Sequence, residues 1–359
     1  MSDAPAKEAK SATPNKTPAA ALPPVAKAPS AKTDPTQVHV AGQWKHTRPL
    51  TACRFDPTGK FVFTGAEDYT VQRWNLKDEK PVLLSGHESW VRAMAFSPDG
   101  QTLYTGGYDG QLLTWPATAD APTPSRKTAA HDGWVRAVAV SPDGRLVATC
   151  GNDRLVKLWS ATDGKLLHTL AGHESHVYNI AFHPAGDSLV SCDLKGGFRD
   201  WDTATGKQRR EFKAESLHKY DTSFRADIGG ARALAFGEGG KVVAAGGVTN
   251  VTNAFAGIGD PALATFEWES VKARPLHTSK ESIRGLIWGM AWHADGYWAA
   301  AIGGPAGYLY FWKPEQAQET FKFKLPDTGR DMSLAPDGQT LVIAHADGNV
   351  RQYRLSKKV

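Results

Sequence analysis

The chain contains 359 residues, of which 41% are hydrophobic, and its formal net charge is +5. This length and composition are typical of a globular protein with two or three average domains or one large repeat array, and the small charge permits an anionic partner without requiring one. The spacing of Cys53, Cys150 and Cys192 gives no support for a zinc site, a thioredoxin-type site or c-type haem, and we expect buried thiols in a reducing compartment.

The first 35 residues differ from the rest of the chain. They are rich in Ala, Pro, Lys, Ser and Thr, and the first aromatic residue is Trp44. Because such a segment buries too little apolar surface to offset the entropy of ordering it, we expect a disordered tail over 1–35 that acts as a spacer or a binding arm. Its apolar piece AAALPPVA is short and contains two prolines, which argues against a secretory signal. No apolar run approaches the roughly 18 residues of a membrane span, so the expected location is cytoplasmic.

From residue 36 onward, one short turn phrase recurs seven times between alternating apolar runs. Its copies are FDPTG (55–59), FSPDG (96–100), VSPDG (140–144), FHPAG (182–186), FGEGG (236–240), WHADG (292–296) and LAPDG (334–338). Pro and Asp suit a turn and Gly supplies a positive φ, so each copy predicts a β-hairpin. A third strand ending at an aromatic residue and a fourth strand follow. Four short strands every 41–44 residues over the first copies are typical of the blades of an all-β propeller.

Polar and aromatic residues recur at identical intervals within the first copies. The sets are His46, Thr64, Asp68 and Trp74; His87, Thr105, Asp109 and Trp115; His131, Thr149, Asp153 and Trp159; and His173, Ser191 and Trp201, with Lys195 where an Asp is expected. With Gly86-His87 and Gly172-His173, these sets resemble the signature of the WD-repeat β-propeller family. The resemblance implies a structural chain of hydrogen bonds in each blade, in which Asp accepts from His and a hydroxyl joins His to Trp. We expect none of these residues to be catalytic.

The resemblance covers residues 36–359 and implies a seven-bladed propeller of four-stranded antiparallel blades. The last three copies keep the turn and an aromatic residue (Trp268, Trp312 and Tyr353) but lack the His, and the seventh keeps Asp347. Because the seventh copy supplies only three strands, we expect a strand at Val38–Val40 to complete the last blade and close the ring.

One position of each copy points to a binding surface. In the family that the chain resembles, the start of the innermost strand opens onto the top face, around the mouth of the central channel. Arginines and aromatic residues occupy this position and the one two residues earlier. The predicted partner-binding residues are Trp90, Arg92, Trp134, Arg136, His176, Tyr178, Arg232, Trp288 and Arg330. Arg suits bidentate recognition of carboxylate or phosphate. Alternatively, these arginines are inherited consensus, or they pair with Glu67 and other acidic residues.

Two irregular segments are expected to overhang the same face as loops. The first, 247–266, interrupts the fifth copy between its second and third strands, and the second, 213–230, links the fourth copy to the fifth. Long loops on a rigid scaffold usually carry function or are loose, and both interpretations stay open.

Three functions are compatible with this sequence. The favoured one is a non-enzymatic scaffold, monomeric within a larger assembly, that docks an acidic or phosphorylated segment of a partner protein. A nucleic-acid binder would use the same arginines together with the tail lysines Lys7, Lys10, Lys16, Lys27 and Lys32. An enzyme is disfavoured because no GxSxG, HExxH or P-loop motif occurs. A basic channel mouth repels a divalent cation, so neither a metal nor another cofactor is expected.

Overall fold

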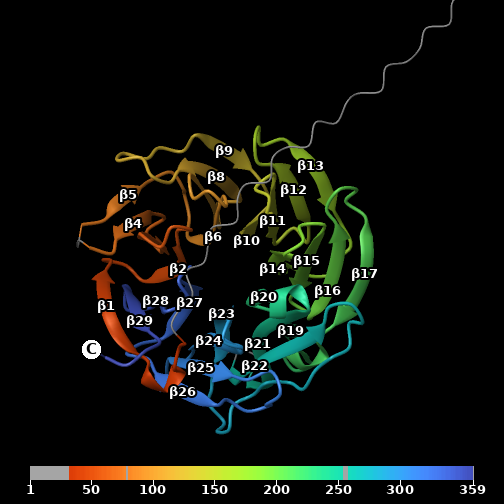
Figure 1. Ribbon diagram of the computed structural model, residues 1–359. Helices are drawn as coiled ribbons and strands as arrows, with labels where there is room; N and C mark the ends of the chain where they lie inside the picture. Colours follow the sequence, from red (N-terminus) through yellow and green to blue (C-terminus); the bar gives the residue numbers. More distant parts are fainter. Residues whose placement is uncertain (1–31, 78–79, 254–257, 359) are drawn as a thin grey trace, which may run out of the picture.

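The computed structural model describes residues 32–77, 80–253 and 258–358, and it shows seven sheets arranged around a central channel (Figure 1). The predicted seven-bladed all-β propeller is confirmed. The predicted tail lies outside the described residues up to position 31. No helix in the described part of the chain is long and apolar enough to cross a membrane.

The first four blades follow the predicted pattern of four antiparallel strands. Blade one contains β2 (Leu50–Phe55), β3 (Phe61–Ala66), β4 (Val71–Asn75) and β5 (Val82–Leu84). Blade two contains β6 (Val91–Phe96), β7 (Thr102–Gly107), β8 (Gln111–Pro116) and β9 (Arg126–Ala129). Blade three contains β10 (Val135–Val140), β11 (Leu146–Gly151), β12 (Val156–Ser160) and β13 (Leu166–Leu170). Blade four contains β14 (Val177–Phe182), β15 (Ser188–Asp193), β16 (Gly197–Asp202) and β17 (Gln208–Lys213).

Blade five departs from the prediction, because its sheet has three strands rather than four. They are β20 (Ala233–Gly237), β21 (Val242–Asn253) and β22 (Ile258–Glu267). Blade six contains β23 (Leu286–His293), β24 (Tyr297–Gly303), β25 (Tyr308–Trp312) and β26 (Phe321–Lys324). Blade seven contains β27 (Gly329–Leu334), β28 (Thr340–His345), β29 (Asn349–Arg354) and β1 (His39–Lys45). Single turns of 3-10 helix occur at η1 (Pro35–Gln37), η2 (Glu215–Leu217) and η3 (Glu238–Gly240).

The segments predicted as overhanging loops are largely β-hairpins. Strands β21 and β22 continue their ladder past the sheet, pairing Gly247 with Ala262 and Thr249 with Asp260. Val248 and Val251 are buried, which favours an extended, packed segment over a loose loop; residues 254–257 of this segment lie outside the described part. In the 213–230 link, β18 (His218–Asp221) pairs with β19 (Ala226–Gly229). The loop prediction was therefore wrong for both segments.

The N-terminal strand closes the ring, as predicted. Strand β1 pairs with β29 from His39, opposite Arg354, to Lys45, opposite Asn349, so it begins and ends later than the predicted Val38–Val40. Contacts also begin upstream of the predicted boundary at residue 36. The Thr33 N–H and hydroxyl donate to Asp295 at 2.8 and 2.5 Å. The first and last strands, β1 and β29, thus lie side by side in one blade (Figure 1).

The repeated turn phrase joins neighbouring blades. Gly100 of blade two has a φ of 71°, and a Cβ on it would lie 3.4 Å from Pro57 in the turn of blade one. Gly144 faces Pro98 in the same way, and Gly59 faces Pro336 across the closure. In blades one to four, therefore, the Gly of each turn faces the Pro of the previous turn, which explains why both residues recur. Blade five has no Pro in its turn, and Gly296 of blade six has no neighbour within 4 Å.

The apolar core lies between adjacent blades. Between blades one and two, Phe63 packs with Leu103, Leu113 and Trp115, all of them fully buried. The three cysteines are also buried and free, and burial raises the pKa of each thiol. They belong to the core as small apolar side chains.

The predicted hydrogen-bond network is present in blades two and three. In blade two the Trp115 N–H donates to the Thr105 hydroxyl at 2.8 Å, the hydroxyl contacts His87 Nε2 at 2.7 Å, and His87 Nδ1 lies 2.9 Å from Asp109. Because the Thr105 hydroxyl donates its proton to Nε2, Nδ1–H donates to the carboxylate, and each of these four side chains has a hydrogen-bond partner. Residues His131, Thr149, Asp153 and Trp159 repeat this geometry in blade three.

Blades one and four show departures that the spacing did not predict. In blade one the Arg48 N–H donates to His46 Nδ1 at 2.8 Å, which turns Nε2 toward Asp68 at 3.3 Å. Trp74 still donates to Thr64 at 3.0 Å. In blade four, Asp193 takes the role of the missing Asp: it lies 2.9 Å from His173 Nδ1, and Ser191 joins His173 to Trp201.

Substituting Asp193 tests this assignment. We expect Asp193→Ala to lower the free energy of unfolding by about 1–3 kcal/mol, because it leaves the buried His173 ring without its acceptor. Lys195→Ala, at the position predicted from the spacing, should change the free energy of unfolding by less than about 0.5 kcal/mol. Asp109→Ala in blade two is the matched positive control. Chemical denaturation measures all three, and equal stability of the Asp193 and Lys195 variants would contradict the assignment.

Blade seven has a different buried histidine. His345 is fully buried; its Nδ1–H donates to the Asp327 carbonyl at 2.9 Å, and its Nε2 lies 3.0 Å from the Tyr353 hydroxyl. Burial lowers the pKa of His345 to about 4. Since the unfolded chain has a His pKa of about 6.5, it binds more protons than the folded chain between these two values.

Stability should therefore decrease as the pH falls from about 6.5 to about 4, by on the order of 3 kcal/mol from His345. His345→Gln keeps a donor and an acceptor but does not titrate, so its free energy of unfolding should vary less over this window. Urea denaturation of both proteins at several pH values measures the difference. Parallel curves for the two proteins would show that His345 does not carry this dependence.

Candidate functional site

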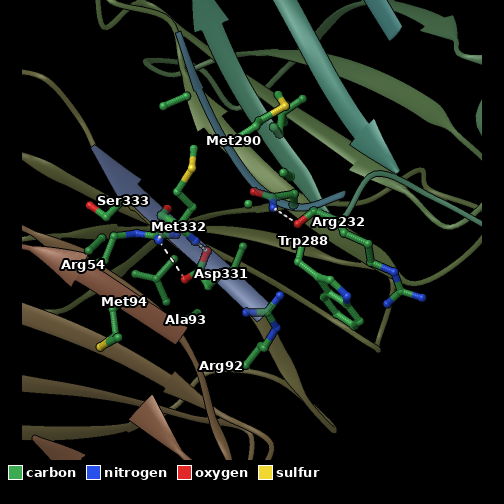
Figure 2. Close-up of a pocket in the computed structure, with 18 of the residues that line it drawn as sticks. Arg54, Arg92, Ala93, Met94, Arg232, Trp288, Met290, Asp331, Met332 and Ser333 are labelled. Atoms are coloured by element: carbon green, nitrogen blue, oxygen red, sulfur yellow. Dashed lines mark hydrogen bonds and ion pairs between the residues drawn. The ribbon is translucent and has the colours of Figure 1, made fainter. Parts of the chain in front are cut away.

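The central channel contains a cavity of about 560 Å³ that is lined by the inner strands of all seven blades. Figure 2 shows part of this lining, with Arg92 and Arg232 on opposite sides of Trp288. The predicted partner-binding residues lie at the start of these inner strands. The site is therefore composite: blades two, three and four contribute two predicted residues each, and blades five, six and seven contribute one each.

A backbone irregularity directs these side chains toward the channel mouth. In six inner strands the ladder register shifts around one unpaired residue. These residues are Thr51, Arg92, Arg136, Tyr178, Trp288 and Arg330. Such a β-bulge re-aims the side chain of the extra residue. In blade five Arg232 immediately precedes β20, and its N–H donates to the Gly246 carbonyl at 2.8 Å.

Arginines and aromatic rings alternate around the mouth. The Arg136 guanidinium carbon lies 4.5 Å from the ring centre of Trp134 and 4.7 Å from that of Tyr178. Arg232 lies 4.1 Å from Tyr178 and 5.6 Å from Trp288. Arg92 of blade two reaches Trp288 of blade six at 5.3 Å. Cation–π contacts thus hold three guanidinium groups in fixed positions.

Three stacked rings extend this arrangement outward over blades two and three. Tyr108 stacks on Trp134 at a centroid distance of 3.9 Å and an interplanar angle of 4°, and Trp90 lies 5.9 Å beyond Tyr108. The sequence interpretation did not include Tyr108. Its position in the repeat could have indicated it. Tyr108 directly precedes the network residue Asp109, and the equivalent residues of blades one and three, Glu67 and Asn152, contact the mouth arginines Arg330 and Arg136.

The arginines differ in how their charge is balanced. Arg330 forms an ion pair with Glu67, as the alternative interpretation of these arginines proposed. Arg136 Nε donates to the side chain of Asn152 at 2.7 Å, and Arg92 donates to the Thr51 carbonyl at 2.6 Å. Within the described residues, Arg92, Arg136 and Arg232 contact no carboxylate. We call these three side chains the arginine cluster.

The electrostatics of the mouth follow from this lack of counter-charge. Burial lowers the pKa of the Arg136 guanidinium, and the charges of Arg232 and Arg92 act in the same direction. Burial also lowers the pKa of His176, and Arg136 and Arg154 lower it further. Among the described residues, His176 makes no ring contact with Trp90, Tyr108 or Trp134. It is therefore linked to the site only through the charge of Arg136.

The same part of the chain holds no group of three or more His, Cys, Asp or Glu side chains that could bind a metal ion. Below the mouth, Arg54 and Asp331 form an ion pair at 2.8 Å (Figure 2). Asp331 also accepts from the Cys53 N–H at 3.0 Å. This ion pair joins blades one and seven. Because each of its charges has an opposite partner, the pair adds no unbalanced charge to the site.

The blade geometry and the His–Ser/Thr–Trp network define a propeller built from sequence repeats. The model of the family WD domain, G-beta repeat, matches residues 39–75, 79–115, 122–160 and 164–199. The chain therefore carries four WD repeats and folds as a seven-bladed β-propeller, whose last three blades lie outside that match.

Relatives with curated names are similar to this chain over short segments. They include the nuclear distribution protein PAC1 of Arthroderma otae, 32% identical over 21% of this chain and 17% of its own length. The small ribosomal subunit protein RACK1y of Oryza sativa is 39% identical over 22% of this chain and 24% of its own length. The guanine nucleotide-binding protein subunit beta of Dictyostelium discoideum is 36% identical over 18% and 19%, respectively. The chain thus matches less than a quarter of each of these relatives.

The pKa of His176 reports on the positive field at the mouth. We expect Arg136→Met, which keeps most of the side-chain bulk, to raise the pKa of His176, because it removes one of the charges that disfavour the imidazolium form. A ring-proton titration followed by NMR measures the pKa. Arg209→Met on the outer strand of blade four is the control. An unchanged pKa in the Arg136 variant would show that this field is screened.

Proposed function

We propose that this protein is a non-enzymatic interaction scaffold whose top face docks an acidic or phosphorylated segment of a partner protein. The observation that supports the proposal is the arginine cluster. Three guanidinium groups converge on one opening, aromatic rings hold them, and no carboxylate within the described residues balances them.

Such a cluster is costly for an isolated protein, since like charges in a partly buried site repel. Each guanidinium carries five N–H donors. The structure gives Arg92 and Arg136 one side-chain hydrogen bond each, to Thr51 and Asn152. Donors therefore remain for an incoming anion, and stacking has already reduced the side-chain entropy that binding would remove. Carboxylate and phosphate are the groups that match this planar donor geometry.

The relatives support a role within an assembly. One of them is named as a subunit and another as a protein of the small ribosomal subunit, and we extend such a role to this chain as a monomeric propeller in a larger complex. Since its three cysteines are buried and form no disulfide within the described residues, the reducing cytoplasm is the location that we propose. We retain the division into a tail over 1–35 and a propeller over 36–359, with the contacts of Thr33 as an extension of the propeller.

Charge reversal at the cluster tests the function. A cross-linking pull-down from native lysate compares the wild type with Arg92→Glu, Arg136→Glu and Arg232→Glu combined. We expect the specific partners to be lost, because the variant repels the anion that the cluster binds. Circular dichroism first confirms that the variant folds.

The matched control carries Arg145→Glu, Arg209→Glu and Arg354→Glu, which change the net charge equally at exposed positions. Retention of the same partners by both variants would overturn the docking site. A nuclease-treated lysate separates the alternative function: partners lost after nuclease, together with a steep dependence on salt, would indicate nucleic-acid binding instead.

A further inference from the structure

We propose, on the basis of the function above, that the docked segment is recognised at two points. Its acidic or phosphorylated residue binds the arginine cluster, and an apolar residue two to four positions away packs on Trp90. The segment then lies across blades two and three rather than entering the channel end-on.

The aromatic stack provides the second point of contact. Trp134 is stacked on Tyr108 at 3.9 Å and also contacts the Arg136 guanidinium at 4.5 Å, and it is 39% exposed. Trp90 differs, because Tyr108 is the only ring or cation recorded against it among the described residues. Trp90 is 40% exposed. An indole face is thus left open at the outer end of the stack.

An exposed Trp that is held by a neighbouring ring is suited to binding an apolar side chain. Trp is among the residues that contribute most to interface energies, and an exposed apolar patch with a polar rim marks an interaction site. Because Tyr108 supports Trp90 from behind, little side-chain freedom is lost when a partner residue packs on its outer face.

The distances set the spacing between the two points. The Arg136 guanidinium carbon lies 5.7 Å from the Tyr108 centroid, which lies 5.9 Å from that of Trp90. An extended chain advances about 3.3 Å per residue. The apolar residue therefore falls no more than about four positions from the acidic one, and at least two because Tyr108 stands between.

Carboxylates beside the stack favour a peptide over a nucleic acid. Exposed Glu88 and Asp132 each lie two residues before a stacked Trp, and Glu88 is balanced by only one lysine, Lys127, at 2.9 Å. A nucleic-acid strand would bring a phosphate past these carboxylates at every nucleotide. A peptide brings one anionic residue, which the arginine cluster accepts, and an uncharged neighbour.

A degenerate peptide library with a fixed central phosphoserine tests the inference on the full chain. We expect the wild type to retain peptides that carry Pro, Leu or an aromatic residue two to four positions to one side of the phosphoserine. Trp90→Ala should abolish this preference and weaken a selected peptide by about tenfold or more, while it still prefers phosphoserine to serine. Fluorescence anisotropy measures the affinities, and the melting temperature confirms the fold.

Tyr220→Ala is the matched control, because Tyr220 is also exposed, at 52%, but lies on the β18–β19 hairpin. The control should bind like the wild type. A preference for phosphoserine without a positional apolar preference, or one unchanged in Trp90→Ala, would overturn this inference and leave the proposed function standing. No preference for phosphoserine or glutamate over serine would overturn both. Tighter binding of a single-stranded oligonucleotide than of any peptide would also contradict the inference.

Discussion

Each blade has two apolar faces that only its two neighbours can cover, and the rest of the structure depends on this constraint. The largest buried side chains, such as Trp115 and Phe63, lie between blades rather than at the centre. A linear array would leave the outer faces of its first and last blades exposed. Pairing of β1 with β29 removes both ends at once. Closure in turn leaves an axial space, which is lined mainly by the inner strands.

The site arises from this axial space and from one backbone irregularity. A regular strand would alternate its side chains between the two faces of the blade. The bulge at the head of six inner strands breaks the alternation, and the side chains of Arg92, Arg136, Tyr178 and Trp288 at this position line the channel. What occupies that position then varies independently of the fold. Arg330 takes Glu67 as a partner, whereas Arg92, Arg136 and Arg232 are held by rings instead.

Much of the fold and part of the site could be predicted from the sequence. Each success and each failure has its own physical reason. The turn phrase and the His-to-Trp spacing predicted the blades because each blade solves the same packing problem. The spacing could not predict that Asp193 replaces the missing Asp, since the turn in blade four differs and spacing assumes equal turns. Nor could it predict the turned ring of His46, which depends on one backbone N–H. Tyr108 was missed because its contacts come from the next blade.

The irregular fifth blade restricts the site to one side. At the base of the β18–β19 hairpin, a Cβ on Gly230 would lie 2.7 Å from the ring of Tyr178, so the hairpin abuts the channel mouth beside Tyr178. Lys219 on the same hairpin donates to the Val251 carbonyl at 2.7 Å, which ties it to the extended β21. Both hairpins lie on the side of blade five. The open side is that of blades two and three, where the stacked rings and Trp90 lie.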